Sequence, residues 1–378
     1  MAWTKVMPAN PVVAVCGATG AVGNEFLNVL HDLDFPASKV IALASARSAG
    51  KKLPFKGCGQ VPAGELTVQE MTPESFEGVD IALFSAGGSV SKAMREAVVS
   101  HGAVMIDNSS AFRMDEDVPL VVPEVNPGDV SWHNGVIANP NCSTIQMVVA
   151  LKPLYDLARI TRVVVSTYQA ASGAGAPAMA ELYDQTREFL DGKPEDELTI
   201  KAFKHRIAFN TIPHIDVFLD DDSTKEEWKM VVETKKIMHD EDLAVSATCV
   251  RVPVLRCHGE SINVEFKSAI TPEQAREALE QAPNVVVMDD TDNKLYPMPG
   301  LLAGTNDTFI GRLRKDPSVE NGLAFWVVAD QIRKGAALNA VQIASSLDLS
   351  FCFIFFPPFS FAFSINVPFL VKKYNLAF

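Results

Sequence analysis

Short apolar runs alternate with amphipathic segments along the first third of the chain. The apolar runs cover residues 12–16, 40–43, 80–84 and 103–106, and turns rich in glycine, serine or alanine follow them. The segments at residues 25–30 and 92–99 have the pattern of helices. Strands that alternate with helices in this way predict a mostly parallel, doubly wound sheet. The fold class that we expect is therefore α/β.

The pattern changes in the second third of the chain. The elements predicted here are strands at residues 162–168, 244–250 and 262–266, a helix at residues 224–238, and a polar, charged stretch at residues 184–204. The 378 residues are too many for one ordinary core, and 48% hydrophobic residues suffice to fill two. We expect a first domain of residues 1–140, completed by a helix at about residues 330–346, and a mixed α/β domain of residues 141–329.

The composition changes again from Leu347 onward. Residues 350–361 are rich in phenylalanine and include Pro357 and Pro358. Because prolines interrupt a helix, a membrane anchor is the weaker of two interpretations. The stronger one is an atypical tail, residues 347–378, that arises from a misread or alternatively spliced end and is not an element of the fold.

Charge and cysteine usage restrict the partners and the compartment. The formal net charge is −13 and the pI is about 5.0, which argues against a nucleic acid or an anionic membrane as partner. The six cysteines have neither the spacing of a zinc site nor that of a disulfide framework, so we expect no metal and a reducing compartment. With no signal or transit peptide pattern at the start, we expect a cytoplasmic protein, with the plastid stroma as the alternative.

The turn after the first strand reads GATGAVG and leads into a helix. Glycines there let the backbone approach a pyrophosphate, which then meets the positive end of the helix. A tight turn without a ligand is the alternative, but the strand–turn–helix context favours a Rossmann-like dinucleotide site. The cofactor residues expected in this turn are Gly17, Thr19, Gly20, Ala21, Val22 and Gly23.

The turn after the second strand is basic at the point where an acidic residue would select NAD. It carries Arg47 between hydroxyl groups, with Lys51 close behind. These groups suit a 2′-phosphate, so we expect NADP(H); a solvated basic turn is the alternative.

A cysteine stands at the start of a predicted helix. Cys142 precedes the apolar periodic run that begins at Ile145, and Asn141 or Ser143 can cap the helix. A helix N-terminus favours the thiolate, which is the nucleophilic form of cysteine. The alternative is a buried packing cysteine.

Four further candidates lie near predicted strand ends. Arg113 follows the strand at residues 103–106, where open α/β sheets present ligand groups; a surface salt bridge is its alternative. Gln169 begins a loop of small residues that lets a flat ring or a backbone lie close, unless that loop is merely flexible. Arg251 and His258 bracket a connection between strands, and a histidine is the natural acid/base partner of a cysteine, although a lone histidine is more often structural.

Glu226 and Lys229 are three residues apart and share one face of the predicted helix at residues 224–238. Such a pair is usually a solvated salt bridge.

Together these stretches resemble aspartate-semialdehyde dehydrogenases of the branch found in bacteria and photosynthetic eukaryotes. The likeness runs from about residue 12 to residue 344. The motifs that carry it, in the order of the family, are GATGAVG, ASARSAGK, FSAGGS, DNSSAFRM, NPNCST, STYQAASGAG, ETKKIM, RVPVLRCHGES and DQIRKGAALNAVQIA.

The resemblance implies the reductive dephosphorylation of L-4-aspartyl phosphate by NADPH, a step in lysine, threonine, methionine and isoleucine biosynthesis. It implies that Cys142 forms a thioacyl enzyme and that His258 is the general acid/base. Gln169 would orient the acyl group, and Asn141 with backbone N–H groups would stabilise the oxyanion.

The resemblance also implies a partner for each charge of the substrate. Arg251 would bind the α-carboxylate, Glu226, or its neighbour Glu227, would bind the α-ammonium group, and Arg113 with Lys229 would hold the phosphate. For the cofactor it implies Arg47 and Ser48 at the 2′-phosphate, and Ser172, Gly173 and Gln331 near the nicotinamide.

Family members are homodimers or tetramers of dimers with the sheet of the second domain in the interface, so we expect a homodimer or homotetramer. Two other functions stay open. One is an N-acetyl-γ-glutamyl-phosphate reductase, against which Glu226 argues, because an acetylated amine carries no positive charge. The other is a catalytically inactive NADP-binding homologue, which the irregular tail motivates.

Overall fold

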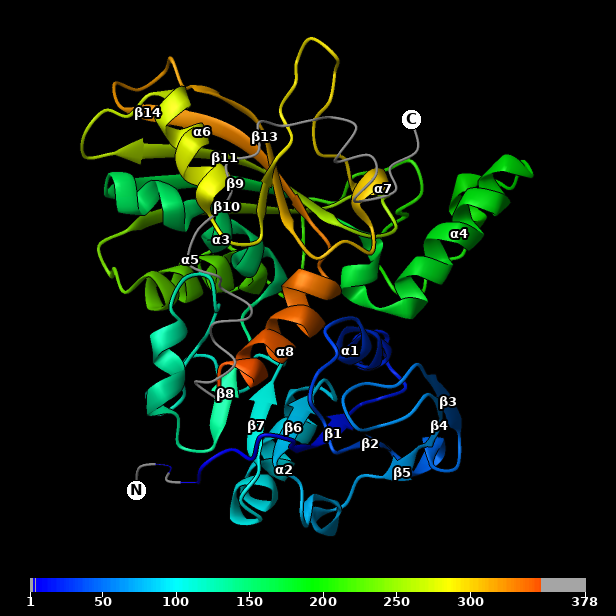
Figure 1. The fold of residues 1–378 in the computed structure, drawn as a ribbon. Helices are drawn as coiled ribbons and strands as arrows, with labels where there is room; N and C mark the ends of the chain where they lie inside the picture. The colour runs from blue at the N-terminus through cyan, green and yellow to red at the C-terminus, as the bar shows by residue number, and fades with distance from the viewer. Residues whose placement is uncertain (1–2, 4, 348–378) are drawn as a thin grey trace. The chain divides into compact units, whose positions relative to one another are not determined.

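The computed structural model describes residue 3 and residues 5–347, which form two compact units (Figure 1). Unit 1 contains the residues up to Asn141 and the described residues from Gly335 onward, and unit 2 runs from Cys142 to Lys334. Of the predicted tail, residues 347–378, only Leu347 belongs to the described residues. Among the residues described, no helix is both long and apolar enough to cross a membrane.

Unit 1 is built on a six-stranded sheet with parallel pairings throughout, in the order β5-β2-β1-β6-β7-β8. The strands are β1 (Val12–Cys16), β2 (Lys39–Ala44), β5 (Gln69–Glu70), β6 (Ile81–Phe84), β7 (Val104–Asp107) and β8 (Val136–Ala138). The α-helices of this unit are α1 (Ala21–Asp32), α2 (Gly88–Ser100) and α8 (Leu338–Ser345). The expected doubly wound α/β fold is confirmed. A hairpin of β3 (Lys52–Phe55) and β4 (Gly64–Thr67) is an addition that the sequence pattern did not predict.

One face of the sheet of unit 1 packs against α1 and α8, which form one core with it. Phe26 of α1 and Val341 of α8 belong to the same cluster as Val13 and Val15 of β1. Strand β1 lies between β2 and β6, so the strand order reverses beside β1. In open α/β sheets, ligands bind at such a reversal, at the carboxyl ends of the strands.

The final helix starts later than the sequence pattern predicted. The Asp330 carboxylate accepts the N–H groups of Ile332 (3.0 Å) and Arg333 (3.2 Å), as a helix cap does. A π-helical turn, Arg333–Ala337, follows before α8 begins at Leu338. The regular helix therefore starts only after an irregular turn, and the boundary between the units falls within that turn.

Unit 2 is built on a mixed six-stranded sheet in the order β10-β9-β11-β14-β13-β12. The strands are β9 (Ile160–Gln169), β10 (Ala244–Arg251), β11 (His258–Phe266), β12 (Val285–Val287), β13 (Thr308–Lys315) and β14 (Gly322–Ala329). The longer helices are α3 (Cys142–Leu157), α4 (Ala176–Leu190), α5 (Lys225–Met238) and α6 (Pro272–Gln281), and the short α7 is Pro299–Leu302. The β9–β10 and β12–β13 pairs are parallel and the others antiparallel, so the mixed α/β second domain is confirmed.

One face of this sheet packs against α5, α3 and α6. The side chains that point to this face are buried, as Val165 of β9 and Ile262 of β11 show. On β9, β10 and β11 the opposite face is largely open in the single chain, and Tyr168 is 41% exposed there. Its ring packs edge-on against Trp326, with the ring centroids 5.3 Å apart.

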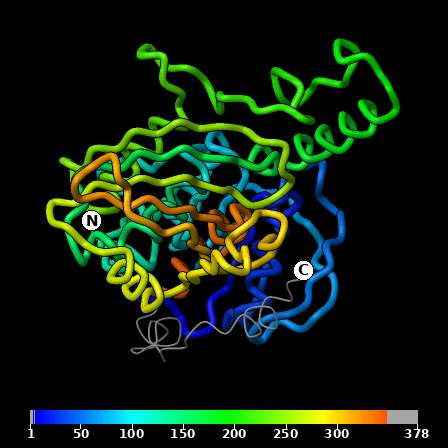
Figure 2. Tube along the Cα trace, turned by 90° about the horizontal axis from the view of Figure 1, so that it is seen from above, coloured from blue at the N-terminus to red at the C-terminus, as the bar shows by residue number. Residues whose placement is uncertain are grey.

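Helix α4 is an element that the sequence pattern did not predict, and it includes the start of the polar stretch at residues 184–204. Two of its polar side chains are buried: Glu181 accepts the N–H of Lys201 (2.6 Å), and Gln185 accepts the N–H groups of Ile207 (2.9 Å) and Ala208 (3.0 Å). In this helix polar residues occupy buried positions against a neighbouring loop. The sequence therefore lacks the regular spacing of apolar residues that usually indicates a helix. In Figure 2, α4 (green) stands apart from the strands of its unit.

Candidate active site

The glycine turn of unit 1 leaves no room for side chains. Gly17, directly after β1, has φ +85°, and a Cβ there would lie 2.3 Å from the carbonyl oxygen of Ser85. A Cβ on Gly23 would lie 2.1 Å from the carbonyl oxygen of Gly17. The turn at the end of β1 is therefore in close contact with the end of β6 and with the first turn of α1.

The start of α1 has the features of an anion site. Gly20 is the N-cap residue, no side chain caps the helix, and its first turn contains no acidic residue. The unpaired N–H groups of a helix N-terminus and the helix dipole both favour a negatively charged ligand. Residues 17–23 thus fit the pyrophosphate of a dinucleotide, at the point where the strand order reverses.

Arg47 and Ser48 lie in a short 3₁₀ turn, Ala46–Ser48, that directly follows β2. Arg47 is exposed, so its guanidinium group is accessible to the phosphate group of a ligand. The end of β2 is where the adenosine ribose of a dinucleotide is recognised, so the residues present fit NADP.

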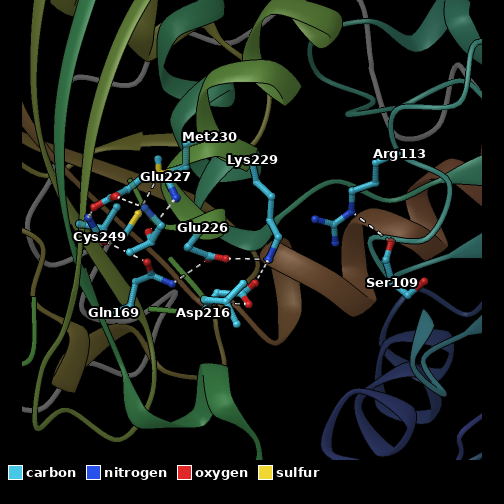
Figure 3. A network of polar contacts seen from close by, with 12 residues as sticks. Ser109, Arg113, Gln169, Asp216, Glu226, Glu227, Lys229, Met230 and Cys249 are labelled. Atoms are coloured by element: carbon cyan, nitrogen blue, oxygen red, sulfur yellow. Dashed lines mark hydrogen bonds and ion pairs between the residues drawn. The ribbon is translucent and has the colours of Figure 1, made fainter. Parts of the chain in front are cut away.

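Arg113 lies in the loop after β7 and is held by the backbone of that loop. Its Nε donates to the carbonyl of Ser109 (3.1 Å) and its Nη2 to the carbonyl of Asn108 (3.0 Å) (Figure 3). The loop itself is anchored by Asp107, which accepts hydrogen bonds from the hydroxyls of Ser91 (2.7 Å) and Ser109 (2.5 Å). Arg113 is only 7% exposed, so the predicted alternative of a plain surface salt bridge does not describe it.

In unit 2, Cys142 is the first residue of α3 and His258 is the first residue of β11. The ring of His258 is fully buried, and its Nδ1 accepts the backbone N–H of Ala170 at 3.0 Å. Burial, followed by the charge of Arg251, holds the pKa of His258 well below its usual value. The ring is therefore neutral at neutral pH. Since Nδ1 accepts a hydrogen bond, the hydrogen of the neutral ring is on Nε2.

Two of the predicted site residues of unit 2, Arg251 and His258, meet at Gly173. A Cβ on Gly173 would lie 2.8 Å from Nη1 of Arg251 and 3.1 Å from Nε2 of His258. Arg251 donates from Nη1 to the carbonyl of Ala170 (2.7 Å), and the charge of Cys142 influences the pKa of Arg251. The imidazole and the guanidinium therefore share one small space beside the backbone of Gly173.

Glu226 is the centre of a buried polar network (Figure 3). Its Oε1 accepts from Nε2 of Gln169 (3.2 Å), and its Oε2 pairs with Nζ of Lys229 (3.1 Å). Lys229 also pairs with Asp216 at 2.7 Å. Burial alone would lower the pKa of Lys229, but Glu226 and Asp216 outweigh it and raise that pKa. The side chains of Glu226 and Lys229 are 7% and 11% exposed, so this pair is not the solvated salt bridge of the alternative interpretation.

Glu227, which the sequence left as the alternative to Glu226, has different hydrogen-bond partners. Its carboxylate accepts the N–H of Thr224 (2.7 Å) in a capping box and the N–H of Cys249 (3.0 Å). It therefore fixes the start of α5 against β10, whereas Glu226 points to Gln169.

Ser172 and Gln331 are also adjacent in unit 2. The Gln331 amide donates to the Ser172 hydroxyl and accepts the N–H of Cys257 (2.8 Å), so both ends of the amide are engaged. Eight of the residues expected at the site come together as one group in unit 2, and these are Gln169, Ser172, Gly173, Glu226, Lys229, Arg251, His258 and Gln331.

Sequence reasoning missed four groups of this site: the N–H of Ala170, Asp216, Gln146 and Glu260. No sequence pattern points to the backbone N–H of Ala170, because backbone N–H groups are common to nearly all residues. No periodic pattern points to Asp216 either, because it lies in a loop, at φ +71°. Gln146 and Glu260 could have been found from spacing: Gln146 is one helical turn after Cys142, and Glu260 is two residues after His258 on a strand. The described residues contain no cluster that could hold a metal ion.

A glycine turn at the strand-order reversal, and a second unit with a cysteine at a helix start, fit a nucleotide-dependent oxidoreductase. The comparisons agree. The family model "Semialdehyde dehydrogenase, NAD binding domain" matches residues 12–133, and "Semialdehyde dehydrogenase, dimerisation domain" matches residues 151–334.

Three known proteins illustrate the similarity. The chain is 58% identical to an aspartate-semialdehyde dehydrogenase of Aquifex aeolicus over 338 residues, which cover 89% of this chain and 97% of that protein. A crystal structure of aspartate semialdehyde dehydrogenase II complexed with ASA, from Vibrio cholerae, superposes with a TM-score of 0.85 at 45% identity, over 90% of this chain and 98% of that one. The structure of the Candida albicans enzyme with NADP has a TM-score of 0.67 at 26% identity, over 91% and 99%. The chain belongs to the semialdehyde dehydrogenase family, and its suspected likeness to the aspartate-semialdehyde dehydrogenases is confirmed.

The space beside Gly173 gives a direct test of this site. A methyl group at Gly173 would collide with Nη1 of Arg251 and with the His258 ring. We expect Gly173→Ala to lower kcat/KM for semialdehyde oxidation by at least about tenfold, because small displacements of reacting groups are costly. The melting temperature should hardly change. Gly300→Ala is the control, since nothing lies within 4 Å of a Cβ there. Wild-type kcat/KM in Gly173→Ala would show that this space is not the reaction site.

Proposed function

We propose that the chain catalyses the NADPH-dependent reduction of L-4-aspartyl phosphate to L-aspartate 4-semialdehyde and phosphate. The observation that carries the proposal is a pair of opposite charges at one end of strand β9. Arg251 and the Glu226 carboxylate both lie around the end of β9, where Gln169 links to Glu226 at 3.2 Å. An α-amino acid carries the complementary pair of charges, a carboxylate for Arg251 and an ammonium group for Glu226.

Cys142 is the proposed nucleophile. Its place in the first turn of α3 and the influence of the Arg251 guanidinium both favour the thiolate. The sulfur attacks the acyl carbon of the substrate, a C–S bond forms, and the C–O bond to phosphate breaks, so that phosphate leaves with the bonding electrons. Asn141, which directly precedes Cys142, and the N–H groups at the start of α3 are the proposed stabilisers of the oxyanion.

NADPH, which residues 17–23 with Arg47 and Ser48 would hold, would supply a hydride for the acyl carbon. The negative charge that then develops on the oxygen needs a hydrogen-bond donor, and Nε2–H of His258 is the donor that the structure offers. Collapse of this oxyanion to the aldehyde breaks the C–S bond and restores the Cys142 thiolate, so the step needs no net proton.

The geometry refines the acid/base role that the resemblance implied for His258. With Nδ1 bound to the N–H of Ala170 at 3.0 Å, Nε2 can donate but cannot accept a proton. To act as a base, the ring would have to break that bond. We therefore propose that His258 acts mainly as a fixed hydrogen-bond donor to the sulfur and to the oxygen that becomes negative.

Further roles follow from family resemblance. We propose Arg113 and Lys229 for the phosphate, Gln169 for the orientation of the acyl group, and Ser172, Gly173 and Gln331 for the nicotinamide end of the cofactor. The engaged amide of Gln331 supports the last role, because it fixes the Ser172 hydroxyl beside Gly173.

We also propose that the chain forms a homodimer through the open face of β9, β10 and β11. The matched dimerisation domain and the half-exposed aromatic pair Tyr168–Trp326 support this proposal. A pair of such dimers would give the tetramer. The cysteines in the described part of the chain are all free, which fits a reducing compartment, the cytoplasm or the plastid stroma.

The first test is the phosphate-dependent reduction of NADP by L-aspartate semialdehyde, followed by the absorbance of NADPH. We expect activity in the wild type and a loss of at least about a thousandfold in Cys142→Ala, because the covalent step cannot occur. Cys58→Ala, a buried cysteine of unit 1, is the control. Equal or faster turnover of N-acetyl-glutamate semialdehyde would favour the acetylated substrate, and NADPH binding without any turnover would indicate an inactive homologue.

Cofactor selection can be tested at Arg47. Loss of a charge-assisted bond to the 2′-phosphate should raise KM for NADP by about tenfold to a hundredfold in Arg47→Ala, while KM for NAD should stay the same. Lys39→Ala is the matched control, because Lys39 lies at the opposite end of the same strand. An unchanged ratio of the two KM values would remove Arg47 from the cofactor site.

The dimer can be tested at Tyr168. A carboxylate buried in an interface is strongly unfavourable, so Tyr168→Asp should be a monomer by light scattering at micromolar concentration, where the wild type is a dimer or tetramer. Trp132→Asp is the matched control, since Trp132 of unit 1 has nearly the same exposure, 42% against 41%. A dimeric Tyr168→Asp would place the interface elsewhere.

A further inference from the structure

Asp216 is a charged residue of the site to which neither the sequence motifs nor the function proposed above gives a role. Its Oδ2 accepts a hydrogen bond from Nζ of Lys229 at 2.7 Å, which is shorter than the 3.1 Å between Lys229 and Glu226 (Figure 3). The side chain of Lys229 is 11% exposed and that of Asp216 is 32% exposed. The two charges therefore lie mostly out of water, in the same network as Glu226.

The segment that carries Asp216 is fixed at both ends to the elements that bear the charged site residues of unit 2. At one end, Ile212 and Arg251 exchange backbone hydrogen bonds of 2.9 and 2.8 Å at the end of β10. At the other end, the N–H of Lys225 donates to the carbonyl of Val217 at 2.8 Å, at the start of α5. Asp216 is therefore held between the end of β10 and the first turn of α5.

The backbone of Asp216 determines which of its oxygens reaches Lys229. Asp216 has φ +71°, a left-handed conformation that aspartate and asparagine adopt more readily than most residues. Its Oδ1 accepts the N–H of the next residue, Val217, at 2.9 Å, so Oδ2 is the oxygen that binds Lys229. Burial alone would raise the pKa of Asp216, but the hydrogen bond and the charge of Lys229 outweigh it and lower that pKa. The group is therefore ionised at neutral pH.

The three side chains of Asp216, Glu226 and Lys229 combine two carboxylates with one ammonium group. Glu226 and Lys229 alone would form a neutral pair, which has no net attraction for the ammonium group of an amino acid. Because Asp216 also binds Lys229, the positive charge of Lys229 is divided between two carboxylates. Glu226 thus retains negative charge for a second cation.

The amino acid of the proposed function completes this charge balance. Its α-carboxylate would offset the positive charge of Arg251, and its α-ammonium group would offset the remaining negative charge of the three side chains. Without Asp216, the ammonium group would have to displace Lys229 from Glu226. An N-acetylated substrate carries no such charge and would gain nothing from Asp216.

We propose that Asp216 is a positioning residue that sets the preference for a free α-amino group: it engages Lys229, so that the Glu226 carboxylate can bind the ammonium group of the substrate. Asp216 itself touches no substrate and transfers no proton. The proposal rests on the function proposed above, in which Glu226 binds the ammonium group.

Asp216→Asn is the direct test, because asparagine adopts the same backbone conformation and keeps an oxygen for the N–H of Val217, while the charge is lost. We expect KM for L-aspartate semialdehyde to rise by about tenfold with kcat within about twofold of the wild type, because binding of the ammonium group is weakened. KM for phosphate should not rise, because Lys229 keeps its charge and loses a competing carboxylate. A damaged fold would raise both KM values.

The preference itself can be measured with 4-oxobutanoate, which is aspartate semialdehyde without its amino group. The ratio of kcat/KM for aspartate semialdehyde to that for 4-oxobutanoate should fall by about tenfold in Asp216→Asn. Asp222→Asn is the matched control and should leave the ratio unchanged, because Asp222 is an exposed residue of the same loop with a similar φ of +62°. An unchanged ratio in Asp216→Asn, or a rise of both KM values, would overturn the proposal.

A double variant tests the route through Glu226. In a Glu226→Gln background, Asp216→Asn should change KM for L-aspartate semialdehyde by less than about twofold, because the charge that Asp216 preserves is already absent. A further tenfold rise of about the same size as in the wild type would show that Asp216 acts by another route.

The reactivity of Lys229 gives a readout apart from turnover. Although burial lowers the pKa of Lys229, Glu226 and Asp216 raise it, so the loss of Asp216 should lower it. Acetic anhydride reacts with the neutral amine, so Lys229 should be acetylated faster in Asp216→Asn and at the wild-type rate in Asp222→Asn, as measured by mass spectrometry of its peptide without substrate. Equal rates in Asp216→Asn and the wild type would contradict the proposal. Absence of turnover in the wild type would instead count against the proposed function, while the acetylation rates still test the link between Asp216 and Lys229.

Discussion

The hydrogen bond from the backbone N–H of Ala170 to Nδ1 of His258 is the interaction on which the chemistry of this site depends. A solvated imidazole exchanges its hydrogen between two nitrogens and gains a charge near pH 6.5. Here a backbone donor occupies one nitrogen, and burial with Arg251 nearby disfavours the charged ring. The result is a neutral ring with a fixed donor at Nε2, which suits an acyl group that becomes negative during reduction.

That bond exists because of how the strands of unit 2 pair. Strands β9 and β10 run parallel, so Gln169 and Arg251 reach the same edge of the sheet together. Strand β11 runs antiparallel to β9, so its first residue, His258, starts at that edge. Ala170 directly follows β9 and faces the histidine. Helix α3 begins with Cys142, so its positive end carries the sulfur.

Two buried carboxyl groups of this unit, Glu226 and Glu260, differ in their surroundings. Glu226 is ionised and compensated, because Lys229 pairs with one of its oxygens and Gln169 donates to the other. Glu260 has no ion pair among the described residues, and burial raises its pKa well above its usual value. The contrast follows from the cost of removing a charge from water, which only a close opposite charge and well-formed hydrogen bonds can offset.

The sequence by itself determined the α/β class, the glycine turn and the helix-start cysteine, because each depends on local pattern: alternation of apolar runs, residues without a Cβ, and spacing along one helix. It also brought Arg251, Glu226 and His258 forward, through motifs in a fixed order. Only the tertiary structure decided that Glu226 rather than Glu227 faces Gln169, since neighbouring residues on a helix differ by rotation alone. The tautomer of His258 and the salt bridge between Lys229 and Asp216 also came from the structure. These features depend on strand pairing and on loops distant in sequence, where no local pattern records which groups will meet.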